Sequence, residues 1–194
     1  MKWIIVSIVV FVAGYTLVNL YFRKPNRPYR PYQDAQDRAT TARLLAAGWH
    51  KVPLANRRPT EKAAINDLPA TITRGAAGLG ADFDANFAEK PRLPAAIDKV
   101  TAPGLVAHGQ DYSFYFTASL PDLKGQIGEF SLYRHGNELV LVPVVEPLPG
   151  KQLMSRWNDA DFSVTFPTAD LPPGRYHARI VSRGPAATWS FTIQ

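Results

Sequence analysis

The residues that could carry chemistry are few, and their spacing matches no catalytic or metal-binding motif. The chain of 194 residues has no cysteine, and its two methionines are Met1 and Met154. The four histidines lie in different segments without ligand spacing, so a copper or zinc site is not expected. They are His50, His108, His135 and His177. No serine has a nucleophile-elbow context and no carboxylate pair stands out. We therefore expect no enzyme activity, no metal and no cofactor.

Two short motifs share some positions with ligand-binding loops without completing them. The run Gly75-Ala-Ala-Gly-Leu-Gly80 has the glycines of a phosphate loop, but no buried strand precedes it and no Gly-Lys-Ser/Thr closes it. Asp82, Asp84 and Asn86 match the first three ligands of a calcium loop, but Phe87 stands where that loop needs glycine. We expect a flexible turn in the first case and a surface acidic turn in the second.

The elements that would position any site begin with an apolar N-terminus. Residues Trp3 to Phe22 are twenty consecutive uncharged residues, and as a helix they would span about 30 Å, the thickness of a bilayer core. This run is too long for a cleaved signal peptide, so it predicts a transmembrane anchor over residues 1–24. Ser7 and Gly14 would lie on one face and let another helix pack closely, although two small residues in twenty also occur by chance.

The charges that flank this run predict its orientation. The basic residues after the run outnumber those before it, and positive residues near a span stay in the cytoplasm. We therefore expect a bacterial inner-membrane protein whose C-terminal domain is cytoplasmic, with the periplasmic side as the alternative. The residues expected to contact anionic lipid headgroups or a partner are Arg23, Lys24, Arg27, Tyr29 and Arg30.

Net charge is uneven along the chain and argues against nucleic-acid binding. The total is +6, of which residues 1–47 carry +5, residues 48–96 carry +2 and residues 97–194 carry −1. A nucleic-acid-binding domain would carry its positive charge on the folded domain. We therefore expect the partners to be other membrane subunits and anionic lipids, with no nucleic acid.

The middle of the chain, residues 25–96, is rich in proline. Prolines recur every three residues over 25–32, which is the period of a polyproline II strut. Such a strut is a spacer or, alternatively, a ligand for a proline-recognising domain. A helix is predicted over about 35–47, capped by Asp34 and ended by Gly48.

The remainder of this middle segment has little periodicity of its own. Apart from a short helix predicted at 61–67, residues 49–96 are punctuated by prolines and contain few large apolar side chains. Segments of this kind are usually disordered or lie along a partner. The sequence therefore predicts an extended Pro-rich arm that partner subunits hold.

From residue 97 the pattern changes to the period of two that is typical of half-buried antiparallel strands. Tight turn residues at 135–137 predict a hairpin between strands at 127–134 and 138–145. Leu139 to Val142 is apolar on both faces, and Pro143 is expected to end this strand or place it at an edge. About seven strands and no strong helix predict an antiparallel two-sheet sandwich over residues 97–194.

Two runs in this domain carry a resemblance to a known class of domains. The run Leu171-Pro-Pro-Gly-Arg-Tyr-His-Ala-Arg-Ile180 resembles the entry to the penultimate strand of immunoglobulin-like and fibronectin-III-like domains, whose corner tyrosine would be Tyr176. The run Trp189 to Ile193 is similar to their last strand. The spacing before the tyrosine is one residue shorter than usual, and the disulfide cysteines are absent. The resemblance covers half of the chain and implies the fold alone. A weaker likeness exists to single-span oxidase-maturation proteins.

Taken together, these patterns favour a non-catalytic, single-span accessory subunit. It would brace or help assemble a larger bacterial membrane protein complex, for example of the respiratory or photosynthetic type. The alternative is a membrane-anchored binding or maturation factor whose β-sandwich recognises a protein or peptide transiently. Stable co-purification with a complex would separate the two.

Overall fold

The chain divides into two units, Met1–Ala39 and Thr40–Gln194. The structure is a computed structural model, and it describes residues 2–21, 31–57, 68–148 and 154–194. The predicted short helix at 61–67 lies outside these residues. The helices are α1 (Lys2–Tyr21), α2 (Pro31–Ala46) and α3 (Ala81–Asp84).

Helix α1 corrects the prediction of a transmembrane span. Among the described residues, no helix is long and apolar enough to cross a membrane. The predicted single-span anchor is therefore wrong.

Helix α2 begins earlier than predicted and ends where predicted. It starts at Pro31, so the last part of the expected proline strut is helical, because proline suits the first turn of a helix. Residues 25–30 of that strut lie outside the described residues. After the helix, Gly48 adopts a φ of +82° and donates its N–H to the carbonyl of Leu45 at 3.0 Å. A left-handed glycine just past the last turn is a common helix end.

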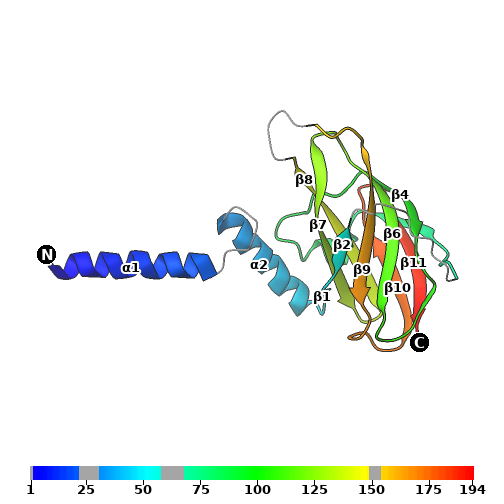
Figure 1. Cartoon of the computed structure of the whole chain (residues 1–194), viewed down its shortest axis with the longest axis horizontal. Coiled ribbons are helices and arrows are strands. Elements are labelled where there is room, and N and C mark those ends of the chain that lie inside the picture. Colours follow the sequence, from blue (N-terminus) through cyan, green and yellow to red (C-terminus); the bar gives the residue numbers. More distant parts are fainter. Residues whose placement is uncertain (1, 22–30, 58–67, 149–153) are drawn as a thin grey trace. The chain divides into compact units, whose positions relative to one another are not determined.

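Eleven strands are present in the described part of the second unit, and they form two sheets (Figure 1). The seven-stranded sheet has the order β1-β7-β8-β10-β11-β3, with β5 also paired to β11, and the four-stranded sheet has the order β2-β9-β6-β4. Their bounds are β1 His50–Val52, β2 Ala55–Arg57, β3 Thr73–Ala77, β4 Ala96–Thr101, β5 Leu105–Val106, β6 Asp111–Ser119, β7 Gly125–His135, β8 Glu138–Pro147, β9 Asp159–Pro167, β10 Gly174–Ile180 and β11 Pro185–Ile193.

The two sheets pack face to face, as the alternation predicted. The inward positions of β6, β9, β10 and β11 are buried in one core between the sheets. They include Phe114, Phe116, Val164, Phe166, Ile180 and Phe191. The predicted hairpin is also confirmed, because β7 pairs with β8 from His135 and Glu138 onward, and Gly136 in the turn has a φ of +56°. The protein is thus mainly β and consistent with a β-sandwich.

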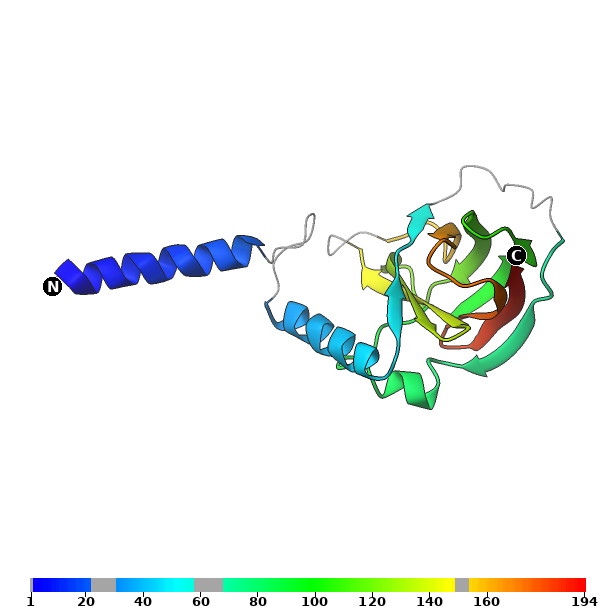
Figure 2. The ribbon, with the colours of Figure 1, turned by 90° about the horizontal axis from the view of Figure 1, so that it is seen from below.

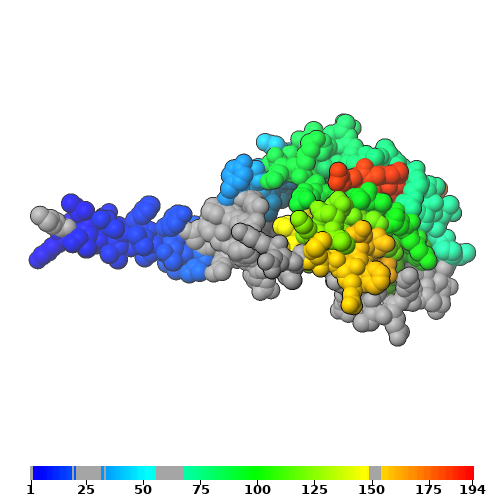
Figure 3. Space-filling view, turned by 90° about the horizontal axis from the view of Figure 1, so that it is seen from above, coloured from blue at the N-terminus to red at the C-terminus, as the bar shows by residue number. Residues whose placement is uncertain are grey.

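A second apolar cluster lies on the other face of the larger sheet, and it corrects the prediction of an extended arm. Leu44, Leu79, Phe83 and Leu93 pack on Val140 and its neighbours there. Leu79, Phe83 and Leu93 belong to the segment that was expected to lie along a partner, and Leu44 belongs to the predicted helix before it. The teal and green segments that contain α3 and β4 cover one side of this unit in Figure 3. The described residues between 40 and 96 therefore belong to the sandwich fold.

This cluster explains why β8 is apolar on both faces at Leu139 to Val142. The expectation that Pro143 ends this strand or places it at an edge is wrong. Strand β8 is central, and it continues past Pro143 to Pro147. Its pairing with β10 ends at Leu141, and beyond that point Val145 donates its N–H to the carbonyl of Arg92 on the same side. The nitrogen of Pro143, two residues before Val145, faces that side as well. No ladder hydrogen bond is lost, so the proline is tolerated.

Both open sides of the sandwich are bridged. The chain passes from β1 at the edge of the larger sheet directly to β2 at the edge of the smaller one (Figure 2). On the opposite side, the guanidinium of Arg74 on β3 donates hydrogen bonds to the carbonyls of Ile97 and Asp98 on β4. These contacts protect sheet edges that would otherwise pair with other chains.

Candidate functional site

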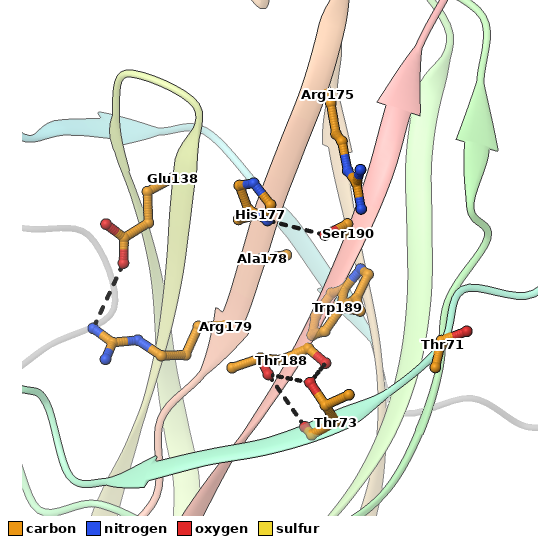
Figure 4. A pocket seen from close by; sticks show the side chains of 10 residues that line it. All are labelled: Thr71, Thr73, Glu138, Arg175, His177, Ala178, Arg179, Thr188, Trp189 and Ser190. Carbon is orange, nitrogen blue, oxygen red and sulfur yellow. Dashed lines mark hydrogen bonds and ion pairs between the residues drawn. The ribbon is translucent and has the colours of Figure 1, made fainter.

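An open groove lies on the face of the larger sheet that points away from the sandwich core. It has a volume of about 650 Å³ and is built on β10 and β11, with β3 and the start of β8 at its borders (Figure 4). Its lining residues are Thr71, Thr73, Glu138, Arg175, His177, Ala178, Arg179, Thr188, Trp189 and Ser190. Because most of these residues sit on paired strands, the groove is preformed.

The polar side chains of the groove form two parallel rows. Arg175, His177 and Arg179 alternate with buried residues along β10, so all three point to the outer face. In the register of β10 and β11 they lie opposite Thr192, Ser190 and Thr188 respectively. A row of basic residues thus faces a row of hydroxyls across two adjacent central strands.

The three basic side chains differ in how far they are already paired. Arg175 is exposed and makes no ion pair with any residue that the structure describes. The Nδ1 atom of His177 lies 2.9 Å from the hydroxyl of Ser190. Positive charge is therefore most available at the Arg175 end of the row.

Arg179 is held at the other end by neighbours on both sides. Its Nη2 atom donates to the carbonyl of Leu79 at 3.0 Å and lies 3.9 Å from a carboxylate oxygen of Glu138. The Arg179 side chain is 21% exposed and that of Glu138 is 47% exposed. Its buried Nε has no hydrogen-bond partner within the described residues. Glu138 therefore cancels part of the positive charge at this end.

The contact between Ser190 and His177 deserves comparison with a catalytic pair, since a serine activated by a histidine is a common nucleophile. A third group must orient the imidazole in such a site. The carboxylate nearest in register is Glu138, and its dashed contact in Figure 4 goes to Arg179 and not to His177. The arrangement is therefore better suited to binding an anionic group than to nucleophilic attack.

The residues that the sequence singled out lie away from this groove. Ser7 and Gly14 are on α1, where Ser7 is exposed and a Cβ added at Gly14 would meet no atom within 4 Å. Their role in helix packing stays a prediction. The predicted basic contact residues lie outside the described residues: Arg23, Lys24, Arg27, Tyr29 and Arg30.

The two loop motifs turn out to be structural. Gly75 to Ala77 belong to β3, and a turn follows in which Gly78 and Gly80 have positive φ, so only the second half of the expected flexible turn is a turn. Asp82 and Asp84 lie on α3, whose Phe83 is buried. Across the described residues, no group of three His, Asp or Glu side chains could hold a metal ion.

The groove was missed because its two rows depend on strand register. The sequence does show that β10 places basic residues, and β11 hydroxyl residues, at every second position. Nothing in the sequence indicates that these positions pair one to one or that the described residues leave this part of the sheet uncovered.

Comparison with protein-family models, with curated proteins and with solved structures finds no match.

Proposed function

We propose that this protein is a non-catalytic accessory protein whose β-sandwich binds another protein through the basic groove. The observation that carries this proposal is the row of Arg175, His177 and Arg179 opposite three hydroxyl residues. Rigid strands hold these side chains in place, so a partner meets a preorganised surface and little ordering entropy is lost on binding. Polar side chains aligned in an open groove suit a partner of complementary charge.

The original alternative, recognition by the sandwich itself, is favoured over bracing by an arm. Bracing was inferred from a middle segment too poor in apolar residues to fold alone, yet Leu44, Phe83 and Leu93 pack on the sandwich. An accessory role in a larger complex is still compatible with this surface. The predicted partners and the predicted location in the bacterial inner membrane stay predictions.

We also propose that the sandwich is immunoglobulin-like or fibronectin-III-like. Tyr176 supports this, because its hydroxyl donates to the carbonyl of Pro172 at 2.8 Å and its side chain is 1% exposed, as a corner tyrosine requires. Two strand pairs depart from that pattern. Strand β8 runs parallel to β10, and β5 runs parallel to β11, whereas the sheets of those domains are antiparallel.

Site-specific crosslinking tests the binding role. A photoreactive residue at Thr73, which lines the groove, is expected to form a discrete protein adduct in cells. The same residue at Lys99, exposed on the smaller sheet, is the matched control and should form none. The adduct should weaken at least fivefold when Arg175→Glu is added. No adduct at Thr73, or the same adducts from both positions, would exclude the groove as the binding surface.

A further inference from the structure

The chemistry of the groove indicates what kind of segment binds there. We infer that it takes an extended segment of a partner protein with acidic side chains at every second residue, the first two opposite Arg175 and His177. This inference rests on the proposed function and names the ligand of the same groove.

The spacing of the basic row supports an extended ligand. Alternate residues of a strand are about 6.6 Å apart, so Arg175, His177 and Arg179 present their nitrogen-bearing side chains at that interval. A partner segment in extended conformation also presents alternate side chains on one face at about 6.6 Å. When it lies along β10, each side chain on its lower face can meet one basic residue. A helical segment would need its acidic residues three and four positions apart to present them on one face, so the spacing of acidic residues in the sequence of the ligand distinguishes the two conformations.

The charges along the row predict which positions matter most. Arg175 has no ion pair among the described residues, and its guanidinium can take a carboxylate in a bidentate contact. The Nδ1 atom of His177 lies 2.9 Å from the Ser190 hydroxyl, so its Nε2 atom can donate an N–H to the ligand. At the third position Glu138 lies 3.9 Å from Arg179 and would repel an acidic side chain. A neutral residue there should therefore bind as well as an acidic one.

The charge of the remainder of the domain favours a peptide over a polynucleotide. Residues 40–194 carry 16 Lys and Arg against 14 Asp and Glu, a net charge of +2, so the unit that holds the groove lacks the strong basic excess of a domain that follows a nucleic-acid backbone. A short acidic segment needs only two or three basic contacts. The hydroxyls of Thr188 and Ser190 along the other row can in addition hydrogen-bond the ligand.

Peptide binding to the purified full chain tests this inference. The fluorescent probes are Thr-Glu-Thr-Glu-Thr-Glu-Thr, its isomer Thr-Thr-Glu-Glu-Glu-Thr-Thr, and the alternating peptide with Gln in place of Glu. The alternating Glu peptide should bind at least fivefold more tightly than its isomer, and the Gln peptide should not bind measurably. Changing to Gln only the terminal Glu that lies opposite Arg179, which is the first or the third according to the direction of the peptide, should alter the affinity by less than twofold.

Variants connect this binding to the groove. Arg175→Gln should weaken the alternating peptide at least fivefold, and His177→Gln should weaken it less. The control Arg183→Gln removes an exposed basic residue outside the groove lining and should change the affinity by less than 1.5-fold. Circular dichroism and the melting temperature of each variant show whether it is folded.

Three outcomes would overturn the inference. These are equal affinity for the two Glu isomers, no effect of Arg175→Gln in a folded variant, and displacement of the peptide by inorganic phosphate at equal concentration. The last result would identify a general anion site. If these peptides fail while the crosslink from Thr73 remains sensitive to Arg175→Glu, the protein partner stands and only its acidic, extended nature is wrong. If the crosslink fails as well, the proposed function falls with it.

Discussion

Tyr112 is a phenol buried in the core, and its hydroxyl is held on both sides. It donates to the carbonyl of Pro103 at 2.7 Å and accepts from the indole Nε1 of Trp189 at 3.0 Å. Burial raises the pKa of this hydroxyl above its ordinary value of about 10, and the Trp189 hydrogen bond offsets only part of that rise. Tyr112→Phe should lower the free energy of unfolding by about 1–3 kcal/mol at pH 8, because both partners lose their hydrogen bond.

The pH dependence of this variant has a defined sign. The unfolded chain releases the phenol proton near pH 10, and the folded chain holds it to higher pH. The contribution of Tyr112 is therefore complete below pH 10 and is lost as the pH rises above that value. The difference in unfolding free energy between wild type and Tyr112→Phe should shrink from pH 8 to pH 10.5 in urea titrations. A constant difference would show that the phenol is not protected from ionisation.

Tyr176 and Tyr115 test the assigned faces of their strands. Tyr176 is buried and stacks on Phe191, with ring centroids 5.6 Å apart, whereas Tyr115 is only half-buried. Tyr176→Ala should cost about 3–5 kcal/mol, as truncating a buried aromatic residue does. Tyr115→Ala should cost less than half as much. Thermal melts of the two variants measure the difference. Equal melting temperatures would contradict the assignment of Tyr176, but not Tyr115, to the core face of its strand.

For single residues, the sequence predicted which side chains are buried better than it predicted which ones line the groove. The inward phase of β6, β9, β10 and β11 follows from alternation alone, because each strand has one face in the core. The groove could not be predicted in the same way. Ser190 becomes a neighbour of His177 only through the register of β10 and β11, and register depends on the turns and the packing of the whole sheet.

The packing of the segment from 40 to 96 on the larger sheet was not predicted from the sequence. The segment from 40 to 96 has few large apolar residues, and these were too widely spaced to show a periodic face. They nevertheless meet on Val140, Val142 and Val181, because this part of the larger sheet is apolar on both faces and needs a cover. The apolar run at Leu139 to Val142 indicated such a cover, and the few large residues before it were the candidates to supply it.

Phe83 on α3 tests this cover. The side chain is 2% exposed and packs edge to face on Trp49, with ring centroids 4.6 Å apart. Phe83→Ala should lower the free energy of unfolding of the purified protein by about 3–5 kcal/mol. Ala85→Ser, at the end of the same short helix, is the control and should cost less than 1 kcal/mol. An unchanged stability of Phe83→Ala in denaturant titrations would show that α3 does not cover the sheet.

The second unit is expected to resist proteases at Arg74 and Arg92 without any partner, in contrast to the sensitive arm that the sequence predicted. Arg74 lies on β3, which pairs with β11, and its guanidinium is bonded to β4. The carbonyl of Arg92 accepts the N–H of Val145 at 2.7 Å. Cleavage needs an extended, accessible backbone, so both sites should be cut only after unfolding. Trypsin digestion of the purified chain, followed by mass spectrometry, should leave a fragment that still joins Arg74 and Arg92 to the C-terminal strands. Rapid cuts at these two residues under native conditions would instead support the prediction of an extended arm that partner subunits hold.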